Sequence, residues 1–205
     1  MSPFSHPALS FDPQSHGAFI FDCDGTLADS MPLHYRAWKE AFESCRARFE
    51  FTPAIMHEMA GIGTIDSVVV LNERFGDTLD PERVVELMSE NLGRIHHLVK
   101  PIEPVMAVAR ALHALKKPIA VASGGTVKHV RLTLGHIGAD KLFDIVVTRE
   151  DVARSKPHPD TFLKAAELLG AAPETCLVFE DSPFGIQAAQ AAGMAHILVP
   201  DPAQL

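Results

Sequence analysis

The stretch FDCDGTLADS (residues 21–30) follows the apolar run AFIF (residues 18–21). It places Asp22 and Asp24 one residue apart at the end of a predicted strand. Side chains alternate along a strand, so we expect these two carboxylates to point the same way and Cys23 to face the opposite side. Two like charges this close together repel each other, so the pair needs a chemical reason to exist.

Short apolar runs alternate with amphipathic helical patterns along the rest of the chain. Strands are predicted at 18–21, 119–122, 145–148, 177–179 and 197–199. Helices are predicted between them at 126–137, at 160–169 and from Ser182 to Gly193. The strand segments are apolar nearly throughout, which is typical of parallel strands covered on both faces. The pattern predicts an α/β fold with a doubly wound, Rossmann-like parallel sheet.

The connection between the first two predicted strands is much longer than the others. From about Gly25 to Pro118 the sequence shows no strand pattern. It shows helical patterns instead, at 32–45, 64–75, 80–92 and 104–116. This connection is too long for a simple crossover. We therefore expect an inserted α-helical cap domain at 31–99 and a core domain at 1–30 and 100–205, with linkers near 28–32 and 100–104.

Composition restricts the possible partners. The 205 residues are 47% hydrophobic, which is enough for a full core, and carry a net charge of −8. That charge argues against nucleic-acid or anionic-membrane partners. No apolar run approaches the ~20 residues of a membrane span, and residues 1–17 resemble a loose tail rather than a secretory signal. We expect a cytoplasmic monomer in which the three cysteines, Cys23, Cys45 and Cys176, are reduced.

Polar residues follow four of the five predicted strands. In chain order they are Asp22, Asp24, Gly25 and Thr26, then Ser123 and Gly124, then Lys156, and then Glu180 and Asp181. Ligands of an open parallel sheet bind beyond the carboxyl ends of its strands, so we expect these groups to converge on one crevice. Several carboxylates crowded together require a cation, and an all-oxygen ligand set favours Mg²⁺.

The remaining groups suit a phosphate. Backbone N–H groups around Gly25 and Thr26, and around Ser123 and Gly124, can donate to anionic oxygens. The hydroxyl of Ser123 adds a donor, and Lys156 adds a positive charge. Each motif alone has a structural explanation as a turn, a loop, a surface lysine or a helix cap. Their joint occurrence at successive strand ends favours a functional site.

Four segments of the chain resemble signatures of the haloacid dehalogenase superfamily of phosphohydrolases. They are FDCDGTLADS, VASGGT, SKPHPDTF and VFEDSPFGIQAA, and the resemblance extends from Phe19 to about Val199. The helical insertion is similar to the cap of the branch that contains β-phosphoglucomutase and small sugar-phosphate phosphatases. His34 and Trp38 in PLHYRAW also match that branch.

The resemblance implies a role for each residue at the strand ends. Asp22 would be the nucleophile that accepts the phosphoryl group, and Asp24 the general acid and base. The carboxylates of Asp22 and Asp181 and the backbone carbonyl of Asp24 would bind Mg²⁺, with Glu180 close by as part of the metal site. Ser123 and Lys156 would hold the phosphate. The dehalogenases of the superfamily lack the second aspartate, so the presence of Asp24 favours phosphoryl chemistry over carbon–halogen cleavage.

Two departures from β-phosphoglucomutase favour a phosphatase. The mutase needs cap cations for a second phosphate and has an arginine after its glycine-rich turn, where this chain has Thr64 in AGIGTI (residues 60–65). The segment 89–91, Ser-Glu-Asn, lacks a lysine that the mutase has. We therefore expect hydrolysis of small phosphorylated sugars similar to fructose 1-phosphate.

Two alternatives stay open from the sequence. Arg36, Lys39 or Arg94 could supply the missing cap cation, which would allow a β-phosphoglucomutase-type mutase. A non-catalytic, phosphate-binding regulatory protein is the other alternative. His34 is the residue of the cap expected to touch substrate, whereas the other ten histidines show no metal-binding spacing. His129 and His136 share a helix face and are expected to lack partners.

Overall fold

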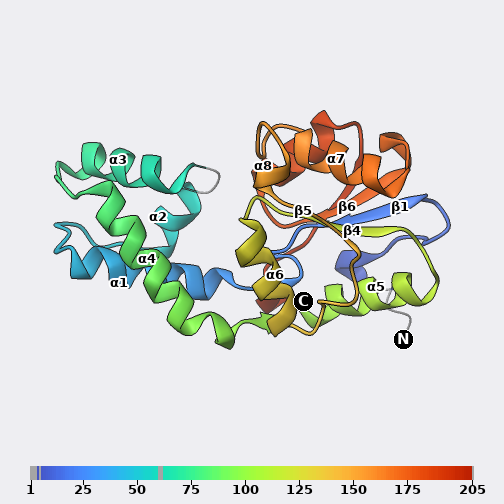
Figure 1. Cartoon of the computed structure of the whole chain (residues 1–205), viewed down its shortest axis with the longest axis horizontal. Coiled ribbons are helices and arrows are strands. Elements are labelled where there is room, and N and C mark those ends of the chain that lie inside the picture. Colours follow the sequence, from blue (N-terminus) through green and yellow to red (C-terminus); the bar gives the residue numbers. More distant parts are fainter. Residues whose placement is uncertain (1–3, 5, 60–61, 205) are drawn as a thin grey trace. The chain divides into compact units, whose positions relative to one another are not determined.

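The computed structural model describes residue 4 and residues 6–59 and 62–204. The chain divides into two compact units, which are described separately here (Figure 1). The sheet unit comprises residues 1–29 and 100–205, and the helical unit comprises residues 30–99. Within the described residues, no helix combines the length and the apolar character that crossing a lipid bilayer requires.

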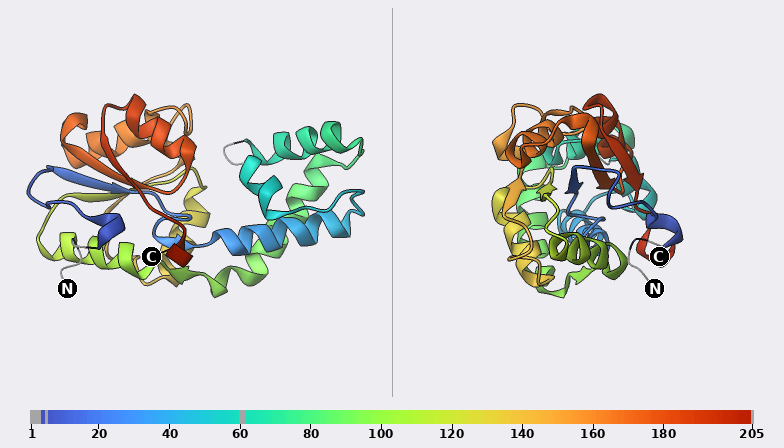
Figure 2. Two further views of the ribbon diagram at one scale, coloured as in Figure 1. Left: turned by 180° about the vertical axis from the view of Figure 1, so that it is seen from behind. Right: turned by 90° about the vertical axis from the view of Figure 1, so that its right-hand side faces the viewer.

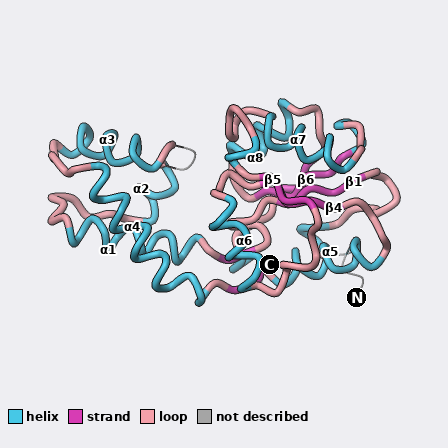
Figure 3. Tube along the Cα trace, viewed as in Figure 1, coloured by secondary structure: helices cyan, strands magenta, loops and turns pink. Residues whose placement is uncertain are grey.

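A five-stranded sheet forms the centre of the sheet unit (Figure 3). Its strands are β1 (Ala18–Phe21), β4 (Ile119–Ala122), β5 (Ile145–Val147), β6 (Cys176–Glu180) and β7 (Ala195–Leu198). They lie in the order β5-β4-β1-β6-β7, and every neighbouring pair is parallel. The predicted α/β fold with a parallel sheet is confirmed.

Helices cover both faces of this sheet. They are α5 (Glu103–Ala114), α6 (Val127–His136), α7 (Asp160–Leu169) and α8 (Pro183–Ala191). Short 3₁₀ turns follow β5 (Arg149–Asp151), precede β6 (Pro173–Thr175) and follow β7 (Pro202–Gln204). Figure 2 shows α5 and α6 on one face and α7 and α8 on the other. The chain runs from β1 outward through β4 to β5 and then returns to β6 on the other side of β1. The strand order therefore reverses between β1 and β6, which is where such sheets bind ligands.

The two faces of the sheet carry different side chains. Small and branched residues such as Ala18, Ile20 and Val178 pack against α7 and α8. On the opposite face, the rings of Phe21 and Phe179 stack with their centroids 4.6 Å apart. These two residues are paired in register on β1 and β6, directly before the predicted site residues. The stack therefore braces the two strands that carry the acids.

The N-terminal segment packs against the aromatic face of the sheet. Leu9, in a 3₁₀ turn at Pro7–Leu9, is completely buried. The ring of Phe11 lies 5.6 Å from that of Phe19 and 5.4 Å from that of Phe179. The expectation of a loose tail is wrong for these described residues. The segment has no helical or strand period, so its contacts with the sheet could not be seen in the sequence.

A two-stranded ribbon stands where linkers were predicted. Strand β2 (Ala28–Asp29) pairs antiparallel with β3 (Lys100–Pro101), and the N–H of Ile102 donates to the carbonyl of Leu27 at 2.9 Å. The expectation that residues 25–118 contain no strand is corrected here. Pairing between two residues and two others so distant in sequence leaves no local pattern.

The helical unit contains α1 (Met31–Ser44), α2 (Pro53–Glu58), α3 (Thr64–Phe75) and α4 (Pro81–Ile95), followed by a 3₁₀ turn at His96–Leu98. Its own core includes Phe42, Phe51 and Leu71. Helix α2 was not predicted, although its signal is present: Thr52 accepts a hydrogen bond from the N–H of Ile55, and proline follows it at the first helical position. Ala60 and Gly61, which open the glycine-rich turn, lie outside the described residues.

Candidate active site

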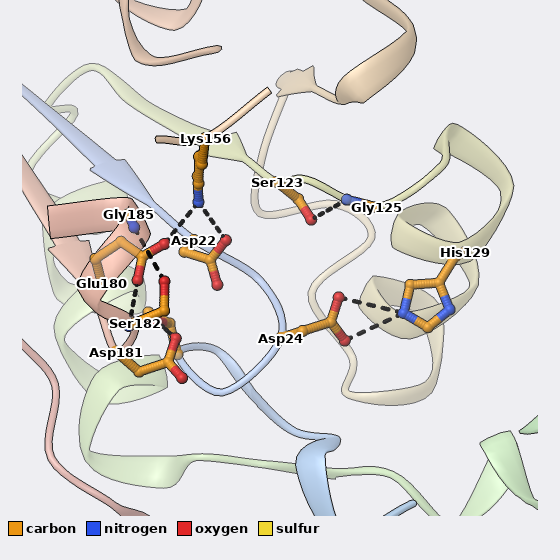
Figure 4. Close-up of polar contacts among 11 residues, drawn as sticks. Asp22, Asp24, Ser123, Gly125, His129, Lys156, Glu180, Asp181, Ser182 and Gly185 are labelled. Carbon is orange, nitrogen blue, oxygen red and sulfur yellow. Dashed lines mark hydrogen bonds and ion pairs between the residues drawn. The ribbon is translucent and has the colours of Figure 1, made fainter. Parts of the chain in front are cut away.

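The first acidic residues of the site come from β1 and β6, the strands between which the sheet order reverses (Figure 4). Asp22 follows β1 directly, and its N–H donates to the carbonyl of Phe179 at 3.0 Å. Glu180 is the last residue of β6. Because the two strands are parallel and in register, their carboxyl ends bring Asp22 and Glu180 to the same edge of the sheet.

Three carboxylates and one ammonium group meet at this edge. Oxygen atoms of Asp22, Glu180 and Asp181 lie within 4.8 Å of one another. The ammonium of Lys156 donates to Asp22 Oδ1 at 2.6 Å and to Glu180 Oε1 at 2.8 Å. One positive charge thus serves a group of three carboxylates, of which Asp22 and Glu180 are buried and Asp181 is partly buried. An oxygen-only donor set with excess negative charge fits a hard divalent cation such as Mg²⁺.

Burial and mutual repulsion shift the pKa values of these groups. Burial raises the pKa of Asp22 well above its usual range, although the charge of Lys156 opposes the shift. Burial would lower the pKa of Lys156, but the facing carboxylates of Asp22 and Glu180 raise it above its ordinary value. Burial, together with the charge of Glu180, raises the pKa of Asp181 to about 7. A bound cation would relieve this repulsion.

Two glycines make room for the acids. Gly25 has a φ of +87°, and a Cβ built on it would collide with the carboxylate of Asp181. A Cβ on Gly185, in the first turn of α8, would collide with the carboxylate of Glu180. Gly185 was missed from the sequence. The sequence did offer a signal, because a glycine inside a helix lowers helix stability by about 1 kcal/mol relative to alanine. A glycine at such a position therefore indicates close packing against a neighbouring group.

The backbone donor expected at Gly25 is already used within its turn. The N–H of Gly25 donates to the carbonyl of Ala28 at 2.8 Å, and the missing Cβ gives clearance to Asp181; its expected contact with phosphate stays a prediction. Thr26 is completely buried, and its hydroxyl donates to Asp181 Oδ1 at 3.2 Å. The side chain of Thr26 therefore orients a candidate metal ligand.

Both oxygens of Glu180 accept hydrogen bonds. Oε1 accepts from Lys156, and Oε2 accepts from the N–H of Ser182 at 2.6 Å. The hydroxyl of Ser182 in turn accepts from the N–H of Gly185 at 3.0 Å and so caps α8. Glu180 is thus held firmly, and it holds Lys156 against Asp22.

Ser123 follows β4, the other neighbour of β1. Its side chain is buried, and its hydroxyl accepts a hydrogen bond from the N–H of Gly125 at 3.0 Å. This bond leaves the hydroxyl proton able to donate to a ligand. A Cβ on Gly124 would meet no atom within 4 Å, so the backbone there stands beside open space.

The carboxylate of Asp24 lies against His129 rather than beside Lys156 (Figure 4). Nε2 of His129 lies 3.1 Å from Oδ1 and 3.2 Å from Oδ2 of Asp24. The expectation that His129 lacks a partner is wrong. Burial would lower the pKa of His129, but its hydrogen bond to Asp24 and the carboxylate's charge raise it. The sequence signal was Thr126, whose cap places residue 129 in the first turn of a helix that follows a strand end.

His34 lies in the first turn of α1 in the helical unit and is partly buried. Its expected contact with substrate stays a prediction. The sheet unit alone holds the expected nucleophile, the second aspartate, the lysine, the serine and the two acids after β6.

Comparison with known proteins agrees with this arrangement. Residues 16–193 match the haloacid dehalogenase-like hydrolase family. The chain is 34% identical over 183 residues to fructose-1-phosphate phosphatase YqaB of Escherichia coli, covering 88% of this chain and 95% of that protein. It is 32% identical over 187 residues to hexitol phosphatase A of E. coli, covering 90% and 83%.

The structure is similar to that of a hydrolase from Pseudomonas syringae, with a TM-score of 0.73 and 28% identity, covering 88% of this chain and 83% of that chain. The fold, the grouped acids and the sequence matches agree. The chain belongs to the haloacid dehalogenase-like hydrolases and is a phosphoric monoester hydrolase of that family.

Proposed function

We propose that the protein is a Mg²⁺-dependent phosphatase of small phosphorylated sugars that works through an aspartyl-phosphate on Asp22. The observation that carries the proposal is the buried contact of Asp22 with Lys156, beside Glu180 and Asp181 and at the reversal of strand order. A carboxylate nucleophile divides one difficult displacement into two easier steps.

In the first step, Asp22 attacks the phosphorus atom. Lys156 donates to Oδ1 of Asp22, which leaves Oδ2 as the attacking oxygen. A bond forms between Oδ2 and phosphorus while the bond from phosphorus to the sugar oxygen breaks. Asp24 gives a proton to that oxygen, which leaves as an alcohol. Lys156 and the hydroxyl of Ser123 offset charge on the phosphoryl oxygens.

In the second step, water releases the phosphate. Asp24, now ionised, accepts a proton from the water as its oxygen attacks phosphorus. The bond between phosphorus and Asp22 breaks, so the carboxylate of Asp22 is restored and inorganic phosphate leaves. Asp24 has regained the proton that it gave in the first step. One residue therefore serves as acid and then as base.

Asp22, Asp181 and the backbone carbonyl of Asp24 would hold the Mg²⁺. When bound, the ion offsets the negative charge of the carboxylates and of the phosphoryl group. Thr26 orients Asp181 for this role. Glu180, whose two oxygens already accept hydrogen bonds, contributes charge to the site and fixes Lys156.

The substrate class rests on the relatives and on the helical unit. Two similar proteins are named as phosphatases of fructose 1-phosphate and of hexitol phosphates. The cations that a mutase could use for a second phosphate each face another group of the helical unit: Arg36 faces Glu40, Lys39 faces Glu43, and Arg94 faces Asn91 and Glu40. Exposed pairs of this kind are weak, so the preference for a singly phosphorylated sugar rests on the relatives and on Thr64 in place of the mutase's arginine, with His34 as the candidate contact from the helical unit.

A substrate panel tests the proposal. The purified chain is assayed with phosphorylated sugars and sugar alcohols, with Mg²⁺ and with a chelator, beside Asp22→Asn. We expect phosphate release that requires Mg²⁺ and is abolished by Asp22→Asn. Lys164→Met, which changes an exposed lysine on α7, is the control and should keep full activity. Conversion of β-glucose 1-phosphate to glucose 6-phosphate in the presence of a bisphosphate primer would contradict the proposal, as would activity that survives in Asp22→Asn.

A further inference from the structure

His129 contacts the carboxylate of Asp24, and neither of the two proposed catalytic steps uses this contact. Its Nε2 is nearly equidistant from the two oxygens of Asp24, at 3.1 and 3.2 Å (Figure 4). The side chains of His129 and Asp24 are only 19% and 21% exposed. A hydrogen bond shielded in this way is stronger than one in water and restricts the carboxylate more closely.

The backbone on each side of this contact is fixed. The N–H of His129 donates to the hydroxyl of Thr126, the N-cap of α6, at 3.2 Å. Gly125 leaves space for the imidazole, since a Cβ there would lie 3.3 Å from His129 Cδ2. Asp24 is held by an isolated bridge to Ala28. The main chain is thus fixed at both residues, and this fixes where the imidazole contacts the carboxylate.

We propose that His129 is a positioning residue that orients the carboxyl group of Asp24 for proton transfer to the leaving oxygen. The inference rests on the proposed function, in which Asp24 is the general acid. A donor at Nε2 that reaches both oxygens limits rotation of the carboxylate about its Cβ–Cγ bond. A general acid works only within hydrogen-bond reach of the atom that it protonates, and a misplacement of about 1 Å can cost on the order of 10²-fold in rate.

Two substrates separate positioning of the acid from a general structural role. A sugar phosphate releases an alkoxide, which needs a proton, whereas 4-nitrophenyl phosphate releases a stable phenolate that does not. The ratio kcat/KM reports the steps up to transfer of the phosphoryl group to Asp22. A change that misplaces the acid therefore lowers kcat/KM for the sugar phosphate much more than for the nitrophenyl ester.

The variants of His129 separate the effect of side-chain volume from the effect of the hydrogen bond to Asp24. His129→Phe keeps a ring of similar volume without a donor, and His129→Gln keeps an N–H at a similar reach. His136→Phe, an exposed position on the same helix, is the matched control. His129→Asn is the second variant should the phenylalanine prevent folding, since its amide is too short to reach where Nε2 lies. Circular dichroism and Tm establish that each variant is folded.

For His129→Phe we expect kcat/KM with the sugar phosphate to fall by about tenfold to a hundredfold, and with 4-nitrophenyl phosphate by less than about threefold. His129→Gln should recover most of the loss, and His136→Phe should show none. Inhibition by inorganic phosphate should stay unchanged, because Lys156 and Ser123 are untouched. Equal losses with both esters, or no loss in His129→Phe, would overturn the inference.

The control reactions separate this inference from the proposed function. Where the wild type is active and depends on Asp22, but His129→Phe matches it on both esters, only the inference fails. Where the wild type hydrolyses neither ester, or Asp22→Asn remains active, the proposed function fails. The inference about His129 then fails as well, because it rests on that function.

Discussion

Lys156 lies between two buried carboxylates, and that position determines what its loss would do. Its side chain is 10% exposed, and its ammonium donates to Asp22 and Glu180 while lying 4.7 Å from the centroid of the Phe162 ring. Removal of the ammonium leaves like charges facing each other without a counterion. The pair therefore belongs to the class of buried ion pairs whose disruption is expensive.

We predict that Lys156→Met lowers the free energy of unfolding by about 3 kcal/mol in the metal-free protein. Lys164→Met, which breaks an exposed pair with Glu167, should change it by less than about 0.5 kcal/mol. Urea denaturation of both variants measures the difference. Equal stability of the two variants would show that Lys156 does not offset the buried charges.

We expect Asp181, a candidate metal ligand, to make metal binding depend on pH. Its pKa of about 7 in the folded protein is above the ordinary value of 3.8. Between these values the folded chain keeps a proton that the unfolded chain has lost, so the metal-free protein loses stability from this group as pH rises. Mg²⁺ at this site would bind the ionised carboxylate, so we expect its stabilising effect to grow over the same range.

We predict that Mg²⁺ raises Tm more at about pH 8 than at about pH 6. Asp181→Asn should remove most of this difference, because an amide does not titrate. Thermal unfolding with Mg²⁺ or with a chelator at both pH values measures it. A Mg²⁺ effect on Tm that is the same at both pH values in the wild type would contradict the role of Asp181.

The N-terminal segment packs against the strands that carry the site. Leu9 is fully buried, and Phe11 touches the rings of Phe19 and Phe179. Phe179 also stacks on Phe21, and these two residues precede Glu180 and Asp22. The segment thus supports the aromatic face of the two strands whose ends form the site.

We predict that Leu9→Ala destabilises the protein by about 2–4 kcal/mol, the usual range for a buried leucine. Ser10→Ala, an exposed neighbour, should have little effect. Chemical denaturation measures both. A loss below about 0.5 kcal/mol in Leu9→Ala would mean that the segment contributes little to the fold in solution.

The ribbon of β2 and β3 pairs the two chain segments that flank the helical unit. Asp29 pairs with Lys100, so the two ends of the helical unit leave the sheet unit side by side. A short turn can join paired antiparallel ends. Each unit also has a hydrophobic core of its own.

We predict that the sheet unit folds when residues 30–99 are replaced by a short glycine- and asparagine-containing turn. Its far-ultraviolet circular dichroism should show helix and sheet, and its thermal unfolding should be cooperative. If the helical unit selects the substrate, this variant should also hydrolyse different sugar phosphates with similar kcat/KM values. A non-cooperative transition would show that the sheet unit needs the helical unit to fold.

Much of this arrangement could be predicted from the sequence because it follows from local patterns. Apolar runs predicted the strands, and the rule for strand ends predicted that Asp22, Lys156, Glu180 and Asp181 meet at one edge of the sheet. Caps and glycines predicted helix limits, so the bounds of α3 and α7 match the sequence-based ranges.

The remainder depends on contacts that no local pattern records. The contact between His129 and Asp24 depends on where α6 starts relative to β1. Alternation along the strand predicted only that Asp22 and Asp24 point the same way, and it could not identify His129 as the partner of Asp24. The buried Leu9 and the pairing of Ala28 with Pro101 are also non-local. The hydrogen bond from Gly25 to Ala28 depends on a turn geometry that the residue types permit but do not require.

In the proposed reaction, Asp22 carries the phosphoryl group during turnover. The direct measurement is rapid quenching of the Mg²⁺-loaded protein with phosphate-labelled substrate, followed by peptide mass spectrometry. We predict an acid-stable, hydroxylamine-sensitive phosphoryl group on the peptide that contains Asp22, and none in Asp22→Asn. Steady hydrolysis without a phosphorylated protein under conditions that resolve a single turnover, or a label on another residue, would contradict this role of Asp22.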